Sequence, residues 1–243
     1  MADLGTRMDL SVIYPAYNEE ENIRLIPGEL LSYLDKTKAN YEVVIVDDGS
    51  LDSTYKEALK LASRYKRIRI ARHKKNQGLG AAVRTGIKAA KGRMIVTIDG
   101  DFTFHPRQIK MLYDEYRKGG ADCIIGSPSL KGYDKSVPSY RIFLSKAANL
   151  IHVMLLGKRI TAVTPIFRLY DAKKLKSLRL ESNRFEINAE ILYKWLIKGY
   201  TVKEVPALLT TRKHGISKLN NLREIKNHLL LMLKAIKWRI AGS

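Results

Sequence analysis

The stretch IVTIDGDFTFHP, residues 95–106, runs from an apolar, β-branched segment into two aspartates that flank a glycine. Segments such as 95–98 are typical of buried strands. Asp99 and Asp101 are two positions apart, and in extended backbone such side chains project to the same side. Two neighbouring carboxylates repel each other unless a cation offsets their charge. Oxygen ligands suit Mg²⁺ or Mn²⁺, so the pair favours a metal site, although Asp and Gly are also common in plain turns.

The rest of the chain repeats this apolar pattern at intervals. Runs typical of strands lie at residues 10–14, 42–46, 67–71, 93–98 and 122–126, and helical spacing lies between them at 19–38, 53–65 and 79–91. Strands that alternate with helices predict an α/β fold with a parallel, doubly wound sheet. The alternation stops after Gly126. Beyond it we predict helices at 139–156, 184–198 and 219–240 and extended structure at 160–171, which favours one domain with a C-terminal extension.

The chain is strongly basic. It contains 44 Lys and Arg against 24 Asp and Glu, a formal net charge of +20, with the excess concentrated in residues 131–160 and 210–243. Such a bias indicates an anionic partner: nucleic acid, an anionic membrane surface or a phosphorylated substrate. The single cysteine, Cys123, excludes an intrachain disulfide. We expect neither a secretory signal nor a membrane-spanning helix, which needs roughly 18–20 apolar residues in a row.

Three of the predicted strands end in polar residues, and the carboxyl ends of parallel strands form the edge where ligands bind. These segments are PAYNEE (15–20), DDGS (47–50) and DGD (99–101). Carboxylates at that edge can accept hydrogen bonds from a nucleobase N–H or from ribose hydroxyls. Asn76, Gly78 and Gly80 precede a predicted helix, whose N-terminus favours anions. We therefore expect these loops to share one crevice that suits a nucleotide and a metal.

The motifs YPAYNEEENI, VVIVDDGSLDST, NQGLGAAVRTGIKAAKG and IDGDFTFHP occur in this order and resemble the successive motifs of the inverting family 2 glycosyltransferases. Within that family the dolichyl- and polyprenyl-phosphate sugar transferases, above all the dolichyl-phosphate mannose synthases, are similar over nearly the whole chain. The resemblance implies a GT-A fold, which is a Rossmann-like, mostly parallel sheet flanked by helices. It also implies a catalytic domain over residues 1–218 and a basic amphipathic helix over residues 219–243.

The resemblance assigns roles to individual residues. The donor nucleotide would be bound by Pro15, Tyr17, Glu19, Asp47, Asp48, Asn76, Gly78 and Asp99. A divalent metal, Mg²⁺ or Mn²⁺, would be bound mainly by Asp101, with support from Asp99. The catalytic residues would be Asp101, Arg141, Arg212 and Lys218. Where the family often has a glutamine ligand, this chain has Thr103, with one extra residue before Pro106, which puts that metal ligand in doubt.

Three segments of the second half resemble the lipid-phosphate subgroup. YRIFLSKAAN (140–149) matches the stretch that holds the acceptor phosphate, through Arg141 and Ser145. TPIFRLYD (164–171) contains the family arginine, Arg168. RKHGISKL (212–219) matches the segment that closes over the donor diphosphate and contributes Arg212, Ser217 and Lys218. Because Pro128 stands where the family often has arginine, Arg141 would carry more of the acceptor phosphate, with help from Lys131.

These similarities imply the transfer of a sugar, with mannose from GDP-mannose expected, to the phosphate of dolichyl or another polyprenyl phosphate. A lipid phosphate is already an anionic nucleophile, so the reaction needs positioning and a stabilised leaving group rather than a catalytic base. A UDP-sugar such as UDP-glucose, or a non-lipid acceptor, remains the alternative. Nucleic-acid binding would explain the charge but not the acidic strand ends, which repel phosphate without a metal, so we expect no nucleic-acid partner.

The predicted helix at 219–240 combines helical apolar spacing with positive charge. Its stripe consists of Leu222, Ile225, Leu229, Met232 or Leu233, Ile236 and Ile240, and Lys226, Lys234, Lys237 and Arg239 lie off it. Interfacial membrane contact and packing on the core would both produce this pattern. We expect peripheral binding to the cytoplasmic face of a membrane, with the membrane surface and a membrane-anchoring protein as candidate partners.

Overall fold

The computed structural model describes residues 8–132, 160–212 and 221–241, together with residues 134, 137, 139, 142, 149, 150 and 214. Within this part of the chain one seven-stranded sheet has the order β3-β2-β1-β4-β6-β5-β7. The strands are β1 (Leu10–Ala16), β2 (Tyr41–Asp47), β3 (Ile68–Arg72), β4 (Met94–Thr97), β5 (Cys123–Ser127), β6 (Arg168–Asp171) and β7 (Val202–Pro206). Strands β3, β2, β1 and β4 are parallel neighbours.

Every apolar run predicted as a strand forms one, and the mostly parallel α/β sheet is confirmed. The sheet is mixed, because β6 lies between β4 and β5 and runs antiparallel to both, a reversal that the sequence did not predict. The reason is the side from which the chain re-enters the sheet. Thr161, shortly before β6, shares a 2.7 Å hydrogen bond with Ser127 at the carboxyl end of β5. A strand that starts at that edge must run opposite to its neighbours.

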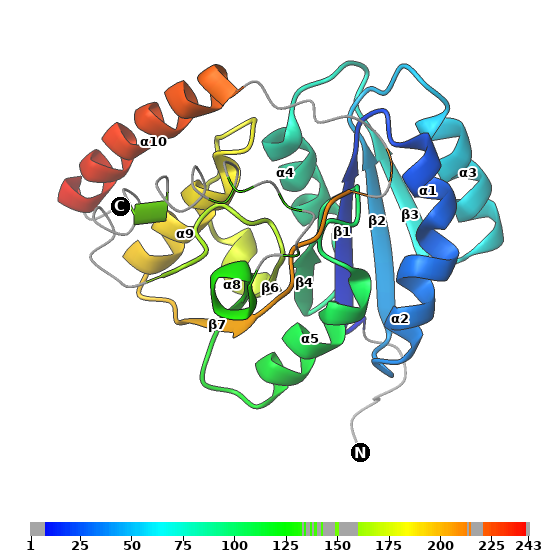
Figure 1. Ribbon diagram of the computed structural model, residues 1–243, viewed down its shortest axis with the longest axis horizontal. Coiled ribbons are helices and arrows are strands. Elements are labelled where there is room, and N and C mark those ends of the chain that lie inside the picture. The colour runs from blue at the N-terminus through cyan, green and yellow to red at the C-terminus, as the bar shows by residue number, and fades with distance from the viewer. Residues whose placement is uncertain are drawn as a thin grey trace.

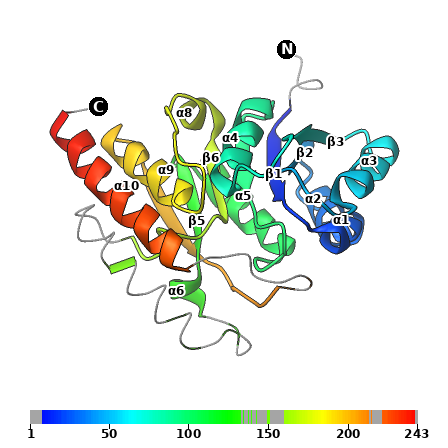
Figure 2. The ribbon, with the colours of Figure 1, turned by 90° about the horizontal axis from the view of Figure 1, so that it is seen from above.

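Helices cover both faces of the sheet (Figures 1 and 2). One face carries α1 (Glu20–Ile26), α2 (Ser32–Asp35), α3 (Thr54–Arg64) and α5 (Ile109–Arg117), and the other carries α4 (Leu79–Ala89), α8 (Ala172–Lys176), α9 (Ile187–Ile197) and α10 (Asn221–Ala241). The alternation of side chains along a strand builds these two cores. In β1, for example, Val12 and Tyr14 belong to the first core and Ile13 to the second.

One helix prediction needs correction, and one helix was missed. The helix expected at 19–38 is interrupted, because α1 ends at Ile26 and a π-helical turn, Pro27–Leu31, precedes α2. Proline has no N–H and cannot continue the α-helical bonding pattern at that point. Helix α5 was not predicted, although its buried Ile109, Leu112 and Tyr113 have helical spacing. Most of the helix predicted at 139–156 lies outside the described residues.

Helix α10 packs beside α9 (Figures 1 and 2). It buries Leu231, Met232 and Ala235, whereas Leu229 and Leu233 are 53% and 60% exposed. Apolar residues therefore occur on two sides of this helix, one against the core and one toward solvent. In the described part of the chain, no helix combines the length and the apolar character that crossing a bilayer requires.

Candidate active site

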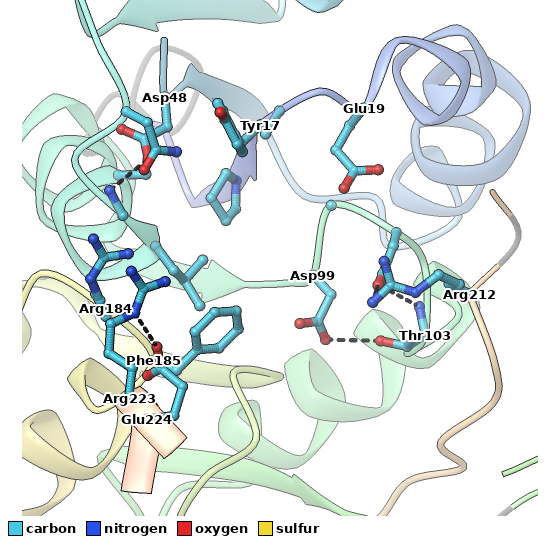
Figure 3. A pocket seen from close by; sticks show the side chains of 18 residues that line it. Tyr17, Glu19, Asp48, Asp99, Thr103, Arg184, Phe185, Arg212, Arg223 and Glu224 are labelled. Carbon is cyan, nitrogen blue, oxygen red and sulfur yellow. Dashed lines mark hydrogen bonds and ion pairs between the residues drawn. The ribbon is translucent and has the colours of Figure 1, made fainter. Parts of the chain in front are cut away.

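A cavity of about 390 Å³ lies at the carboxyl ends of β1, β2 and β4 (Figure 3). The residues predicted from sequence that line it are Pro15, Tyr17, Glu19, Asp48, Asn76, Gly78, Asp99, Asp101 and Arg212. The predicted loops therefore do share one crevice. The close approach of the loop after β4 to the end of β1 explains the glycine between the aspartates: a Cβ at Gly100 would collide with the carbonyl oxygen of Pro15.

Asp99 and Asp101 reach the cavity by a different route from the one predicted. The backbone after β4 is a turn rather than an extended strand, and Phe102 in it has a φ of 57°. The Asp101 carboxylate accepts a hydrogen bond from the Thr103 N–H at 3.1 Å, and the Thr103 hydroxyl donates to Asp99 at 3.2 Å. Buried Phe102 and Phe104 anchor this turn in the core. Both carboxylates line the cavity, so they share a site because of turn geometry and anchoring.

The two carboxylates interact electrostatically. Burial and the charge of Asp101 raise the pKa of Asp99 to about 8. Arg212 partly offsets this repulsion, because its Nη2 lies 3.2 Å from Asp101 Oδ2 (Figure 3). The carboxylates of Asp99 and Asp101 therefore repel each other, and a bound cation would reduce this repulsion.

The donor set fits a divalent cation that is shared with a substrate. No group of three or more His, Cys, Asp or Glu side chains suited to a metal occurs among the described residues. A site that rests on two carboxylates is nevertheless ordinary for Mg²⁺ when phosphate oxygens and water complete the coordination. Thr103 occupies the place of the family glutamine, and its hydroxyl donates a hydrogen bond to Asp99. Asp99 and Asp101 are therefore the residues that would hold the metal.

Asp48 performs a structural task in the cavity wall. Its two carboxylate oxygens accept hydrogen bonds from the Gln77 and Gly78 N–H groups at 2.9 and 2.7 Å, and His73 Nδ1 lies 2.6 Å from Oδ1. His73 in turn pairs with Thr85 on α4 at 2.8 Å. Asp48 therefore fixes the loop at 76–78, just before α4, beside the cavity.

Other predicted residues lie away from the cavity. Asp47 is fully buried, and its carboxylate accepts hydrogen bonds from Ser50 N–H and from Arg72. Arg168 is fully buried as well and donates to the carbonyl oxygens of Asn188 and Val163. Lys131 is exposed at the end of the short helix α6 (Pro128–Lys131). Arg141, Ser145, Ser217 and Lys218 lie outside the described residues.

Among the cavity residues that were not predicted, four form one charged and aromatic part of the wall. Arg184 and Phe185 precede α9, and Arg223 and Glu224 lie in the first turn of α10 (Figure 3). The only available signal was their position at the start of two predicted helices, which does not distinguish a site from a surface. The segment before α9 lies very close to the start of α4. A Cβ at Gly78 would collide with the carbonyl oxygen of Asn183, so only glycine fits there.

Comparison with known proteins identifies the family. The sequence profile of the family described as glycosyl transferase family 2 matches residues 11–179. The chain belongs to glycosyl transferase family 2. This family 2 chain is 35% identical over 236 residues to a protein of Pyrococcus furiosus named dolichol-phosphate mannosyltransferase, covering 95% of the chain and 64% of that relative. It is 32% identical to the polyprenol monophosphomannose synthase of Mycolicibacterium smegmatis, covering 95% of the chain and 87% of that protein.

Solved structures share the fold of this family 2 chain. One of them is glucosyl-3-phosphoglycerate synthase of Mycobacterium tuberculosis in complex with Mn²⁺, UDP and glucosyl-3-phosphoglycerate. The two structures superimpose with a TM-score of 0.68 at 19% sequence identity, and the match covers 96% of this chain and 80% of the synthase chain. Another is S. aureus TarS in complex with UDP-GlcNAc, with a TM-score of 0.65 at 20% sequence identity. That match covers 94% of this chain and 66% of the TarS chain. These similarities confirm the GT-A-like arrangement expected from the motifs.

Proposed function

We propose that this chain transfers mannose from GDP-mannose to the phosphate of dolichyl phosphate or another polyprenyl phosphate. The observation that carries the proposal is the cavity at the carboxyl ends of β1, β2 and β4, in which Asp99 and Asp101 face Arg212. A nucleoside diphosphate sugar offers a base, a diphosphate and a sugar, and this cavity offers polar loops, a cation site and arginines for them. The names of the two curated relatives support mannose and a polyprenyl acceptor.

The donor would lie along the cavity with its diphosphate at the acidic loop. Pro15, Tyr17 and Asn76 would contact the nucleoside, with the 76–78 loop positioned by Asp48. Asp101 and Asp99 would hold Mg²⁺ or Mn²⁺ together with diphosphate oxygens. A bound divalent cation supplies positive charge beside the leaving diphosphate. Arg212, released from Asp101, would then donate hydrogen bonds to the diphosphate.

The acceptor phosphate would attack without a catalytic base. Its oxygen forms a bond to the anomeric carbon while the bond from that carbon to the diphosphate oxygen breaks, and the nucleoside diphosphate leaves with the electron pair. The protein therefore contributes positioning and charge stabilisation. We assign Arg141 and Ser145 to the acceptor phosphate, with help from Lys131, and Lys218 and Ser217 to the donor side along with Arg212.

We further propose that the catalytic domain, residues 1–218, approaches the cytoplasmic face of a membrane through the extension at 219–243. On α10 the exposed Leu229, Leu233 and Ile236 stand beside exposed lysines such as Lys234. Apolar side chains that enter the lipid boundary and lysines that meet anionic headgroups are the two components of interfacial binding. A membrane-anchoring protein would be a second means of retention at the same surface.

A donor panel tests the reaction. The protein would be incubated with GDP-mannose, UDP-glucose or UDP-GlcNAc and a short polyprenyl phosphate, with Mg²⁺, with Mn²⁺ or with excess chelator, and lipid products would be identified by mass spectrometry. We expect a mannosyl phosphate lipid from GDP-mannose that disappears with chelator. A product from UDP-glucose alone would establish the alternative donor, and the absence of lipid product with every donor would reject the proposal.

Vesicle flotation tests the membrane surface. The variant Leu229→Asp/Leu233→Asp should lose binding to vesicles that contain anionic lipid. The matched control is Leu59→Asp on α3, where the leucine is 47% exposed, and this variant should bind like the wild type. Equal flotation of all three proteins would show that α10 does not mediate membrane binding.

A further inference from the structure

The cavity wall formed by Arg184, Phe185, Arg223 and Glu224 has a chemistry of its own. In Figure 3 Asp48 lies at one end of the pocket and Glu224 at the other, and Asp99 faces the space between them. The wall near Glu224 combines an aromatic ring, two guanidinium groups and one carboxylate. The reaction proposed above, which rests on Asp101, Arg212 and the acceptor-phosphate residues, gives this wall no task.

Glu224 is the unusual member of the wall. It is 8% exposed, and its Oε2 is buried without a hydrogen-bond partner among the described residues. The Phe185 backbone N–H donates a hydrogen bond to this carboxylate, whereas Arg223 Nε lies 4.0 Å from Oε1, which is too far for a hydrogen bond. Burial and the nearby charge of Glu186 raise the pKa of Glu224, and together they outweigh the lowering effects of the Phe185 N–H and of the neighbouring arginines. A buried carboxylate oxygen that is left unsatisfied is costly, and a ligand with hydrogen-bond donors would remove that cost.

The charge of Glu224 restricts which part of a donor can lie against it. An ionised carboxylate only accepts hydrogen bonds, and a diphosphate near neutral pH offers no donor and carries the same sign of charge. A neutral group with several O–H or N–H donors is therefore the matching ligand. The nucleoside is accounted for at the Asp48 end, and what remains of a sugar nucleotide is the sugar.

We propose that Glu224 and Phe185 form the subsite for the transferred sugar, in which the Glu224 carboxylate accepts hydrogen bonds from sugar hydroxyls and Phe185 packs against the apolar face of the ring. This assignment rests on the proposed function and deepens it. A partial rotation about the last side-chain torsion of Glu224, which is soft, would turn the unpartnered Oε2 toward the cavity. Phe185 is 37% exposed and lines the same wall. The start of α10 thereby becomes an element of donor specificity.

Calorimetry without acceptor tests the subsite. Binding of GDP-mannose and of GDP, and of UDP-glucose and of UDP, would be measured with Mn²⁺ at pH 8 for the wild type and for Glu224→Gln. We expect the variant to bind the sugar nucleotide about tenfold more weakly while binding the matching nucleoside diphosphate within about twofold, because one charge-assisted hydrogen bond is lost. The control Asp114→Asn neutralises an exposed carboxylate on α5, outside the cavity, and should change neither.

A second arm avoids any effect of the substitution on folding. The wild type would be tested with sugar nucleotides that each lack one hydroxyl of the sugar, and at least one should bind about tenfold more weakly than the parent. In Glu224→Gln that same analogue should bind nearly as well as the parent. An equal loss for sugar nucleotide and nucleoside diphosphate, or no loss at all, would overturn the subsite. Because no acceptor is present, this result is separate from whether lipid transfer occurs, which tests the proposed function.

Discussion

Arg212 Nη2 lies 3.2 Å from Asp101 Oδ2, so an arginine of the protein itself neutralises the acidic loop in this structure. The position is the one in which a metal and a diphosphate would meet. If Asp101 binds the proposed metal, the metal and Arg212 would compete for the same carboxylate, and metal binding would be linked to the release of Arg212. Removing Arg212 should therefore raise the affinity of Asp101 for the metal but lower the rate of sugar transfer.

The first prediction concerns Asp101→Asn. The side chain is polar, partly exposed and at the tip of a turn, and asparagine can still accept the hydrogen bond from Thr103. We expect the transfer rate to fall at least about a hundredfold, since the main metal ligand is lost, and the melting temperature to stay the same or rise slightly. Full activity of this variant, measured with saturating metal, would exclude Asp101 as the principal ligand.

The second prediction concerns Arg212→Ala. Without its competing cation, Asp101 should bind Mn²⁺ more tightly in the absence of nucleotide, whereas transfer should slow by about a hundredfold because the leaving diphosphate loses a donor. Calorimetry and steady-state rates measure the two effects. Arg212→Lys, which keeps the charge but not the bidentate geometry, should lie between the two proteins. A parallel loss of metal affinity and rate would instead mean that Arg212 only maintains the loop.

The third prediction is a pH dependence of metal binding. Because burial and Asp101 raise the pKa of Asp99 to about 8, the metal-free site holds a proton at neutral pH that the metal must displace. Mn²⁺ affinity should therefore increase with pH, by up to about tenfold per unit below pH 8, and level off above it. Titrations at pH 7 in buffers of different ionisation enthalpy should detect proton release, and Asp99→Asn should abolish it. A flat affinity between pH 6 and about pH 8 would contradict this assignment.

The fourth prediction concerns stability. Glu190 is fully buried and accepts hydrogen bonds from Lys194 at 2.6 Å and from Ser182 N–H at 2.7 Å. Burial acts to raise its pKa, but these partners outweigh burial and lower the pKa below that of an ordinary glutamate. The ionised group therefore stabilises the fold at any pH above the ordinary glutamate pKa, and this contribution is lost as pH falls through the lowered pKa. Glu190→Gln should destabilise the protein by about 3 kcal/mol at neutral pH.

Thermal melts as a function of pH measure this effect. The difference in melting temperature between the wild type and Glu190→Gln should shrink in acid, as the wild-type carboxylate takes up its proton. The control Glu181→Gln removes an exposed carboxylate with a long 3.8 Å pair to Arg179 and should change stability by less than about 1 kcal/mol. A constant difference across the acid range would show that ionisation of Glu190 does not contribute.

Much of the fold could be read from the chain because its signals are local. The apolar runs that became β1, β2 and β4 end in polar loops, and the carboxyl ends of parallel strands necessarily meet at one edge. The grouping of Pro15, Asp48 and Asp99 around one cavity followed from that rule. The antiparallel direction of β6 could not be predicted in this way, because the direction of a short apolar strand depends on the edge at which the chain re-enters the sheet.

Side-chain partners were decided only by tertiary structure. The sequence determined that carboxylates gather at the sheet edge, but not that Asp48 would accept hydrogen bonds from the loop before α4 while Asp101 pairs with Arg212. It also carried no signal that Glu224 would complete the wall, since that residue enters through the packing of α10 on α9. Periodicity and turn chemistry act between neighbours in the chain, whereas the partner of a buried charge is chosen by desolvation and distance among segments that only folding brings together.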